Sequence, residues 1–127
     1  MKRTICVIVC AWLLAGCALE VRREPVQFSP STEALERTFV LRDSVVAIPS
    51  SGYPRTLKAG SIWKYVGRVP QGAVFAIKDD VFMLEGRNYH EAQCVLSGDQ
   101  TLVGFYLPVE KAFASIQQPV QLPLKRP

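Results

Sequence analysis

Histidine and cysteine, the side chains that most often bind metals or act as nucleophiles, are scarce in this chain of 127 residues. His90 is the single histidine, and Cys94 is the single cysteine after residue 17. The stretch from His90 to Cys94 imitates the zinc motif His-Glu-x-x-His but ends in a cysteine. In a strand these two side chains would lie about 13 Å apart. The sequence therefore predicts no metal site, and it disfavours His90 as a base for a Cys94 nucleophile.

Motifs for nucleotide cofactors and for acid–base pairs are also absent. Neither Gly-x-x-x-x-Gly-Lys-Ser/Thr nor Gly-x-Gly-x-x-Gly occurs, so no cofactor is predicted. Glu85, Glu91 and Glu110 are isolated in the sequence, and nothing specifies two carboxylates with separated pKa values. No run of basic residues with interleaved aromatics is present, which disfavours nucleic acid as a partner. These absences favour a protein that binds rather than catalyses.

The N-terminus carries the most informative pattern in the chain. Lys2 and Arg3 precede an apolar run from Ile5 to Leu14, which is too short to span a bilayer and is typical of a secretory signal. Leu14-Ala15-Gly16-Cys17 resembles the lipobox of bacterial lipoproteins, in which a peptidase cuts before the cysteine after its thiol has received a diacylglyceryl group. The resemblance implies removal of residues 1–16 and lipidation of Cys17. In that family an aspartate after the cysteine often retains the protein in the inner membrane, and Ala18 stands there instead. We therefore expect an outer-membrane protein anchored by lipid on the periplasmic side.

Removal of the signal changes both the charge and the cysteine count. The net charge falls from +4 to +2, because Lys2 and Arg3 leave with the signal. Cys6 and Cys10 leave as well, and lipid occupies Cys17, so no internal disulfide is expected. Cys94 is then predicted to be buried, because an exposed thiol would be a liability in an oxidising compartment.

The mature chain is long enough for one small domain. Residues 17–36 contain prolines, serines and charges without a sustained apolar period, so we predict a lipidated N-terminus followed by an extended tether. Residues 37–116 form the predicted domain. Residues 117–127 contain three prolines and are predicted to be an extended, polyproline-like tail.

Strand signals dominate the predicted domain. Short runs rich in Val, Ile, Phe and Tyr alternate with Gly, Pro, Asp or Asn clusters, which indicates about six strands. The predicted strands are Phe39 to Ile48, Ser61 to Val69, Ala73 to Ile77, Val81 to Leu84, His90 to Leu96, and Thr101 to Leu107. The polar stretches Lys78 to Asp80 and Ser97 to Gln100 are predicted to close two antiparallel hairpins.

We therefore expect an all-β, mainly antiparallel fold, a small barrel or strongly curved sheet of about six strands. An SH3-like barrel is the first expectation. Pro108 can open a helix, so Val109 to Ile116 is predicted to form a short helix or turn. The alternative is a curved antiparallel sheet with this segment packed on one face.

Aromatic residues supply the candidate binding surface, which we place at Tyr53, Trp63 and Tyr106. Packing against a sheet face is the competing interpretation for each of them. Trp63 and Tyr65 share the uncharged face of their strand, whereas Lys64 lies on the other, so these two are expected to point inward.

The sequence supports three alternative functions. The first is a non-enzymatic accessory module that binds a protein of the cell envelope. The second is a module that binds cell-wall peptidoglycan, and the third is a small hydrolase that uses Cys94 or a carboxylate.

Overall fold

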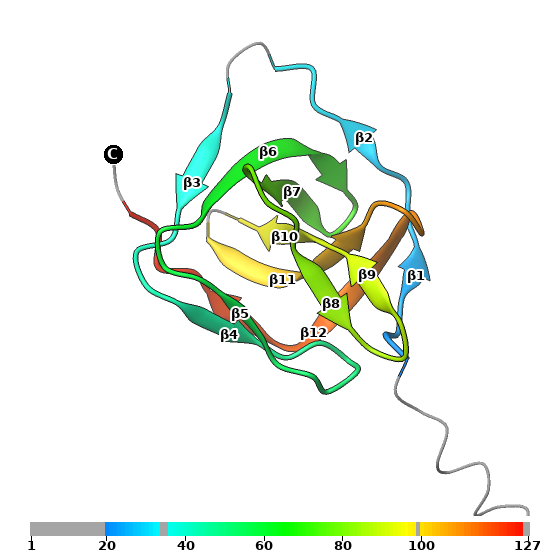
Figure 1. The fold of residues 1–127 in the computed structure, drawn as a ribbon. Coiled ribbons are helices and arrows are strands. Elements are labelled where there is room, and N and C mark those ends of the chain that lie inside the picture. Colours follow the sequence, from blue (N-terminus) through cyan, green and yellow to red (C-terminus); the bar gives the residue numbers. More distant parts are fainter. Residues whose placement is uncertain (1–19, 34–35, 99, 126–127) are drawn as a thin grey trace, which may run out of the picture.

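The computed structural model of the protein describes residues 20–33, 36–98 and 100–125. The predicted signal and Cys17 lie outside the described residues. Within the described part, all regular structure is β and no helix occurs (Figure 1). One eight-stranded sheet and two separate two-stranded hairpins make up the fold, and the paired strands are antiparallel. The prediction of an all-β, antiparallel, strongly curved sheet is confirmed.

The described strands differ in length, and the longest ones build the centre of the sheet. Their bounds are β1 (Glu24–Pro25), β2 (Ser29–Pro30), β3 (Thr38–Val40), β4 (Val45–Ala47), β5 (Arg55–Leu57), β6 (Ile62–Val69), β7 (Gly72–Ile77), β8 (Met83–Glu85), β9 (Tyr89–Glu91), β10 (Gln93–Ser97), β11 (Thr101–Leu107) and β12 (Ala112–Gln121). The main sheet has the order β1-β12-β11-β10-β7-β6-β2, and β3 also pairs with β6. β4 with β5 and β8 with β9 form the two hairpins.

The sheet has an apolar layer on each face, because side chains alternate between the faces along a strand. Trp63, Phe75, Cys94 and Phe105 are buried in the larger cluster. A smaller cluster on the other face contains Val69, Val74, Val95, Tyr106 and Phe113. Neighbours such as Val74 and Phe75, or Phe105 and Tyr106, therefore lie in different clusters. Both faces of this small sheet need a cover against water.

The N-terminal segment provides the cover for the smaller cluster. The tether predicted over residues 17–36 is wrong for residues 20–33: β1 pairs with β12, β2 pairs with β6, and Val21 is buried in the larger cluster. Val26 and Phe28 pack on the smaller cluster, and the Phe28 ring stacks on Tyr106 at 4.9 Å between centroids. The sequence did not predict the strands of this segment, because exposed prolines and charged residues interrupt its apolar residues.

β2 pairs with β6 at Gly67, where the N-terminal segment comes very close to the sheet. A Cβ atom at this position would collide with the carbonyl oxygen of Ser29 and with the ring of Phe28. The register of the β6–β7 pair shifts between Tyr65 and Gly67, at the same place. The absence of a side chain at Gly67 therefore lets the N-terminal segment lie on the sheet.

The predictions for the C-terminal part, a short helix or turn followed by an extended tail, are also wrong for most of these residues. The stretch Val109 to Ile116 contains no helix: residues 108–111 form a turn, with Lys111 at φ 54°, and β12 begins at Ala112. β12 then runs to Gln121, into the predicted tail. Pro119 is accommodated where the β11–β12 register shifts, since Gly104 faces Ser115 whereas Leu102 faces Val120.

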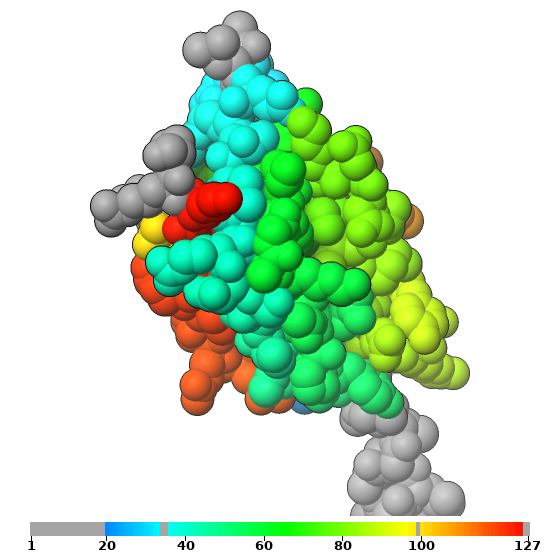
Figure 2. Space-filling model, turned by 60° about the vertical axis from the view of Figure 1, so that its left-hand side comes forward, coloured from blue at the N-terminus to red at the C-terminus, as the bar shows by residue number. Residues whose placement is uncertain are grey.

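The last described residues bring the ends of the curled sheet together. The amide of Arg42 donates to the carbonyl of Pro123 and that of Lys125 donates to Val40, both at 2.8 Å. Figure 2 shows this end of the chain against the segment that contains β3. The predicted tail therefore continues β12 to Gln121, and beyond it an isolated bridge between Leu124 and Leu41 and these two hydrogen bonds hold it against the end of β3.

The predicted strands and hairpins have mixed outcomes. β10 and β11 form an antiparallel pair that ends at Ser97 and Thr101, which confirms the hairpin predicted here. Lys78 to Asp80 does not close a hairpin, because β7 pairs with β6 and β10 while β8 pairs with β9. The predicted strand from Phe39 to Ile48 is divided into β3 and β4, and β4 pairs with β5, which the sequence did not reveal.

Candidate functional site

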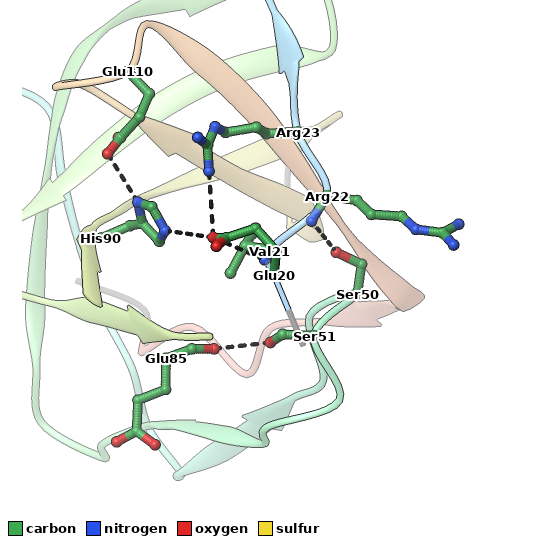
Figure 3. Close-up of polar contacts among 9 residues, drawn as sticks. All are labelled: Glu20, Val21, Arg22, Arg23, Ser50, Ser51, Glu85, His90 and Glu110. Atoms are coloured by element: carbon green, nitrogen blue, oxygen red, sulfur yellow. Dashed lines mark hydrogen bonds and ion pairs between the residues drawn. The ribbon is translucent and has the colours of Figure 1, made fainter. Parts of the chain in front are cut away.

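A buried histidine held between two carboxylates is the most unusual polar feature of the described structure. His90 lies on β9 and is 5% exposed. Its Nδ1 lies 2.8 Å from Oε1 of Glu110, and its Nε2 lies 3.1 Å from Oε1 of Glu20 (Figure 3). Arg23 Nη1 lies 3.6 Å from the same Glu20 oxygen. We call His90, Glu20 and Glu110 the His90 clamp.

Three segments far apart in the sequence meet at the His90 clamp. Glu20 is the first described residue, His90 is on the β8–β9 hairpin, and Glu110 lies in the turn between β11 and β12. The interpretation of Glu110 as an isolated carboxylate was therefore wrong. Nothing in the local pattern indicates these contacts, because the partners are 70 and 20 residues away from His90.

The electrostatics of the clamp favour charged carboxylates. The hydrogen bond from His90 lowers the pKa of Glu20 against a smaller opposing effect of desolvation. Burial is the largest single effect on Glu110 and raises its pKa, but the hydrogen bonds from His90 and from the Glu110 backbone, together with the charges of His90 and Arg23, outweigh burial, so the net pKa is also lowered. Each ring nitrogen faces a carboxylate oxygen, and only the imidazolium carries an N–H on both nitrogens. The clamp is thus complementary to a positively charged ring.

This geometry suits holding segments together better than proton transfer. A general base needs a free nitrogen within reach of a substrate proton, and both His90 nitrogens already have partners. The hydroxyl of the nearby Ser51 donates to the carbonyl of Glu85 at 2.8 Å, and Ser50 accepts from the amide of Arg22 at 2.9 Å. These bonds join the β4–β5 turn, the β8–β9 hairpin and the start of the described chain.

Cys94 lies in the larger apolar cluster and is 0% exposed, as predicted. Burial raises the pKa of its thiol well above the usual range. The thiol therefore stays protonated and is a poor nucleophile. Among the described residues, no group of three or more His, Cys, Asp or Glu side chains is arranged to hold a metal ion.

The three aromatics of the predicted binding surface lie in different places. Trp63 is 0% exposed in the larger cluster, and its Nε1–H donates to Ser61 Oγ at 2.9 Å. The inward orientation of Trp63 is thus confirmed, and its assignment to a binding surface is wrong. Tyr106 is 4% exposed beneath Phe28, so it is also unavailable to a partner. Only Tyr53 is substantially exposed, at 38%.

An apolar groove that the sequence analysis missed lies between β4 and the end of β12. Val46, Ile48, Gln117, Gln118 and Val120 line a volume of about 300 Å³. Val46 is 54% exposed and Ile48 is 38% exposed, whereas Ala47 between them is buried. The amide of Gln117 donates to the carbonyl of Ile48 at 2.8 Å, which fixes the two walls relative to each other. We call these five residues the β4–β12 groove.

Comparisons with protein-family models, with curated proteins and with solved structures found no match to this chain. The SH3-like expectation and the lipobox resemblance consequently stay predictions. No helix in the described ranges is long and apolar enough to cross a membrane.

Proposed function

We propose that this protein is a lipid-anchored lipoprotein of the outer membrane, and that its domain is a non-enzymatic module that binds a protein of the cell envelope. The lipobox-like Leu14-Ala15-Gly16-Cys17 supports the anchor. The exposure of Val46 and Ile48 in the β4–β12 groove is the main support for protein binding. Exposed apolar side chains beside polar ones are typical of recognition surfaces.

The groove favours an extended apolar segment of the partner. Val46 and Ile48 point to the same side of their extended segment, so they can accept alternate side chains of a peptide strand. Gln117 and Gln118 add amide groups that can donate to and accept from the partner backbone. The groove thus offers apolar area for contact and amide groups that can orient the backbone of the partner.

Site-specific photocrosslinking in cells tests the groove. A photoreactive residue at position 46 should give one discrete protein adduct, and Ile48→Ser should remove that adduct. The matched control is position 81, because Val81 is 58% exposed but does not line the groove. An adduct equally strong at position 81, or one insensitive to Ile48→Ser, would argue against the groove as the binding surface.

The wall-binding alternative predicts a different result. Retention of the lipid-free domain on insoluble peptidoglycan, unchanged by Val46→Ser with Ile48→Ser, would favour a peptidoglycan-binding module. The hydrolase alternative requires Cys94 to react, and the burial of its thiol does not support this.

The anchor itself is tested by Cys17→Ala. Because the acyl chains are the proposed membrane attachment, the variant should leave the membrane fraction and accumulate uncut precursor. Fractionation after a high-salt wash measures this. A wild-type N-terminus at a residue other than Cys17 would replace the lipoprotein by a secreted protein.

A further inference from the structure

The His90 clamp fixes the start of the folded chain very close to the proposed lipid. Glu20 is the third residue after Cys17, and three residues reach at most about 10 Å. Glu20 itself is bound by His90 and by Arg23, and the next residue, Val21, is buried at 2% exposure. If Cys17 carries the lipid, no long spacer separates the membrane from the domain.

Two hairpin tips lie beside this attachment point. The β4–β5 turn is joined to the start of the chain by the bond from the Arg22 amide to Ser50, and to the β8–β9 hairpin by the bond from Ser51 to Glu85. Both tips lie at the lower end of the molecule in Figures 1 and 2. The attachment point and the two tips therefore share one end of the domain.

Each tip carries an exposed tyrosine. Tyr53 follows the β4–β5 turn and is 38% exposed, and Tyr89 ends the β8–β9 turn and is 69% exposed. Arg22 and Arg87 at the same end are exposed as well. Tyrosine favours the boundary between water and lipid, where its ring is buried and its hydroxyl stays hydrated, and arginine can bind lipid phosphates. Glu20 does not oppose this contact strongly, since His90 and Arg23 already partner its carboxylate.

We propose that this end of the domain rests on the lipid headgroups, with Tyr53 and Tyr89 at the interface and with Arg22 and Arg87 facing the phosphates. The inference rests on the proposed lipidation of Cys17. The short link keeps the tips close to the lipid surface and so gives a high effective concentration for their contacts with it. Weak contacts at the tips are therefore sufficient to orient the domain. The β4–β12 groove then has a defined orientation relative to the bilayer.

Fluorescent labelling of the lipidated protein in vesicles tests this orientation. Tyr53→Cys and Tyr89→Cys would each be labelled with an environment-sensitive dye, and Val81→Cys is the matched exposed control, because the β7–β8 connection lies away from this end in Figure 1. Cys94 is buried and does not compete for the dye in the folded protein. The same variants in a lipid-free protein that begins at Ala18, which lacks the signal with Cys6 and Cys10, define the emission in water.

On vesicles of phosphatidylethanolamine and phosphatidylglycerol, both tyrosine positions should shift to the blue and be quenched by spin-labelled lipid, whereas position 81 should stay at its value in water. Flotation of the protein with the vesicles and the mass of the lipid on Cys17 report the anchor separately. A protein without lipid would refute the lipoprotein proposal. A floating protein whose tip labels stay at the value in water, or whose label at position 81 shifts instead, would overturn the orientation alone.

Discussion

Trp63 illustrates how much of this small fold depends on single buried aromatics. Its indole packs edge-on against Phe82 at 5.6 Å between ring centroids and lies 6.3 Å from Phe39. Phe82 in turn stacks on Phe105 at 5.5 Å. Trp63 therefore connects β6 with the segment before β8 and, through Phe82, with β11.

Removal of this side chain should be very costly. Trp63→Ala is expected to lower the free energy of unfolding by about 3–5 kcal/mol, since it leaves a large cavity in the cluster. Urea unfolding followed by circular dichroism measures the loss. Trp63→Phe is the control and should retain most of the stability. A loss below about 1 kcal/mol for Trp63→Ala would contradict the packing described here.

Cys94 should behave as a structural residue. Because the thiol is buried and its pKa is raised by burial, thiol reagents should label the folded domain slowly and the unfolded domain rapidly. Ser97→Cys provides an exposed thiol on the same strand and should react rapidly in the folded state. Rapid labelling of native Cys94 would revive the nucleophile hypothesis.

At the scale of elements, the segment from Glu24 to Pro30 covers the face of the sheet that carries the smaller apolar cluster. It pairs with β12 at one edge and with β6 at the other, so it crosses the intervening strands. The Phe28 ring lies in the middle, on Tyr106. The segment makes few strand pairs, and its apolar contacts are therefore the main source of its adhesion.

Phe28→Ala should detach part of this cover. We expect a loss of about 1–3 kcal/mol in the free energy of unfolding, together with increased binding of a hydrophobic dye to the uncovered cluster. Gln27→Ala is the matched control, because the neighbouring Gln27 side chain is exposed. Equal stability of the two variants would show that the segment is not held by Phe28.

At the scale of the whole molecule, the His90 clamp joins the start of the chain to the β8–β9 hairpin and the β11–β12 turn. The folded-state pKa values of Glu20 and Glu110 lie below their ordinary value of 4.5. Carboxylates with lowered pKa values stabilise the fold at pH values above the unfolded-state value, and this contribution is lost as the pH falls through the folded-state values.

Stability should consequently decrease as the pH is lowered from about 5 towards 3. Glu110→Gln should reduce this dependence, since its side chain cannot ionise. Urea unfolding across this range measures the effect, and Glu24→Gln, a carboxylate outside the clamp, serves as the control. An identical pH dependence for wild type and Glu110→Gln would indicate that the clamp does not couple to folding.

The sequence by itself determined the features that depend on local pattern. Short runs rich in β-branched and aromatic residues identified β6, β7, β10 and β11, the polar stretch after Ser97 identified one hairpin, and the uncharged face of β6 placed Trp63 inside. These predictions succeeded because side-chain alternation and turn chemistry act over a few residues.

Only the tertiary structure decided which distant segments meet. The N-terminal segment and the end of β12 contain prolines and polar residues. They form strands because their backbone groups pair with neighbouring strands, and the N-terminal segment also packs on an apolar face of the sheet. The pairing of His90 with Glu20 and Glu110 likewise depends on how the sheet curls. Such contacts carry no local signal, because their free energy comes from burial and pairing between residues that the sequence separates by tens of positions.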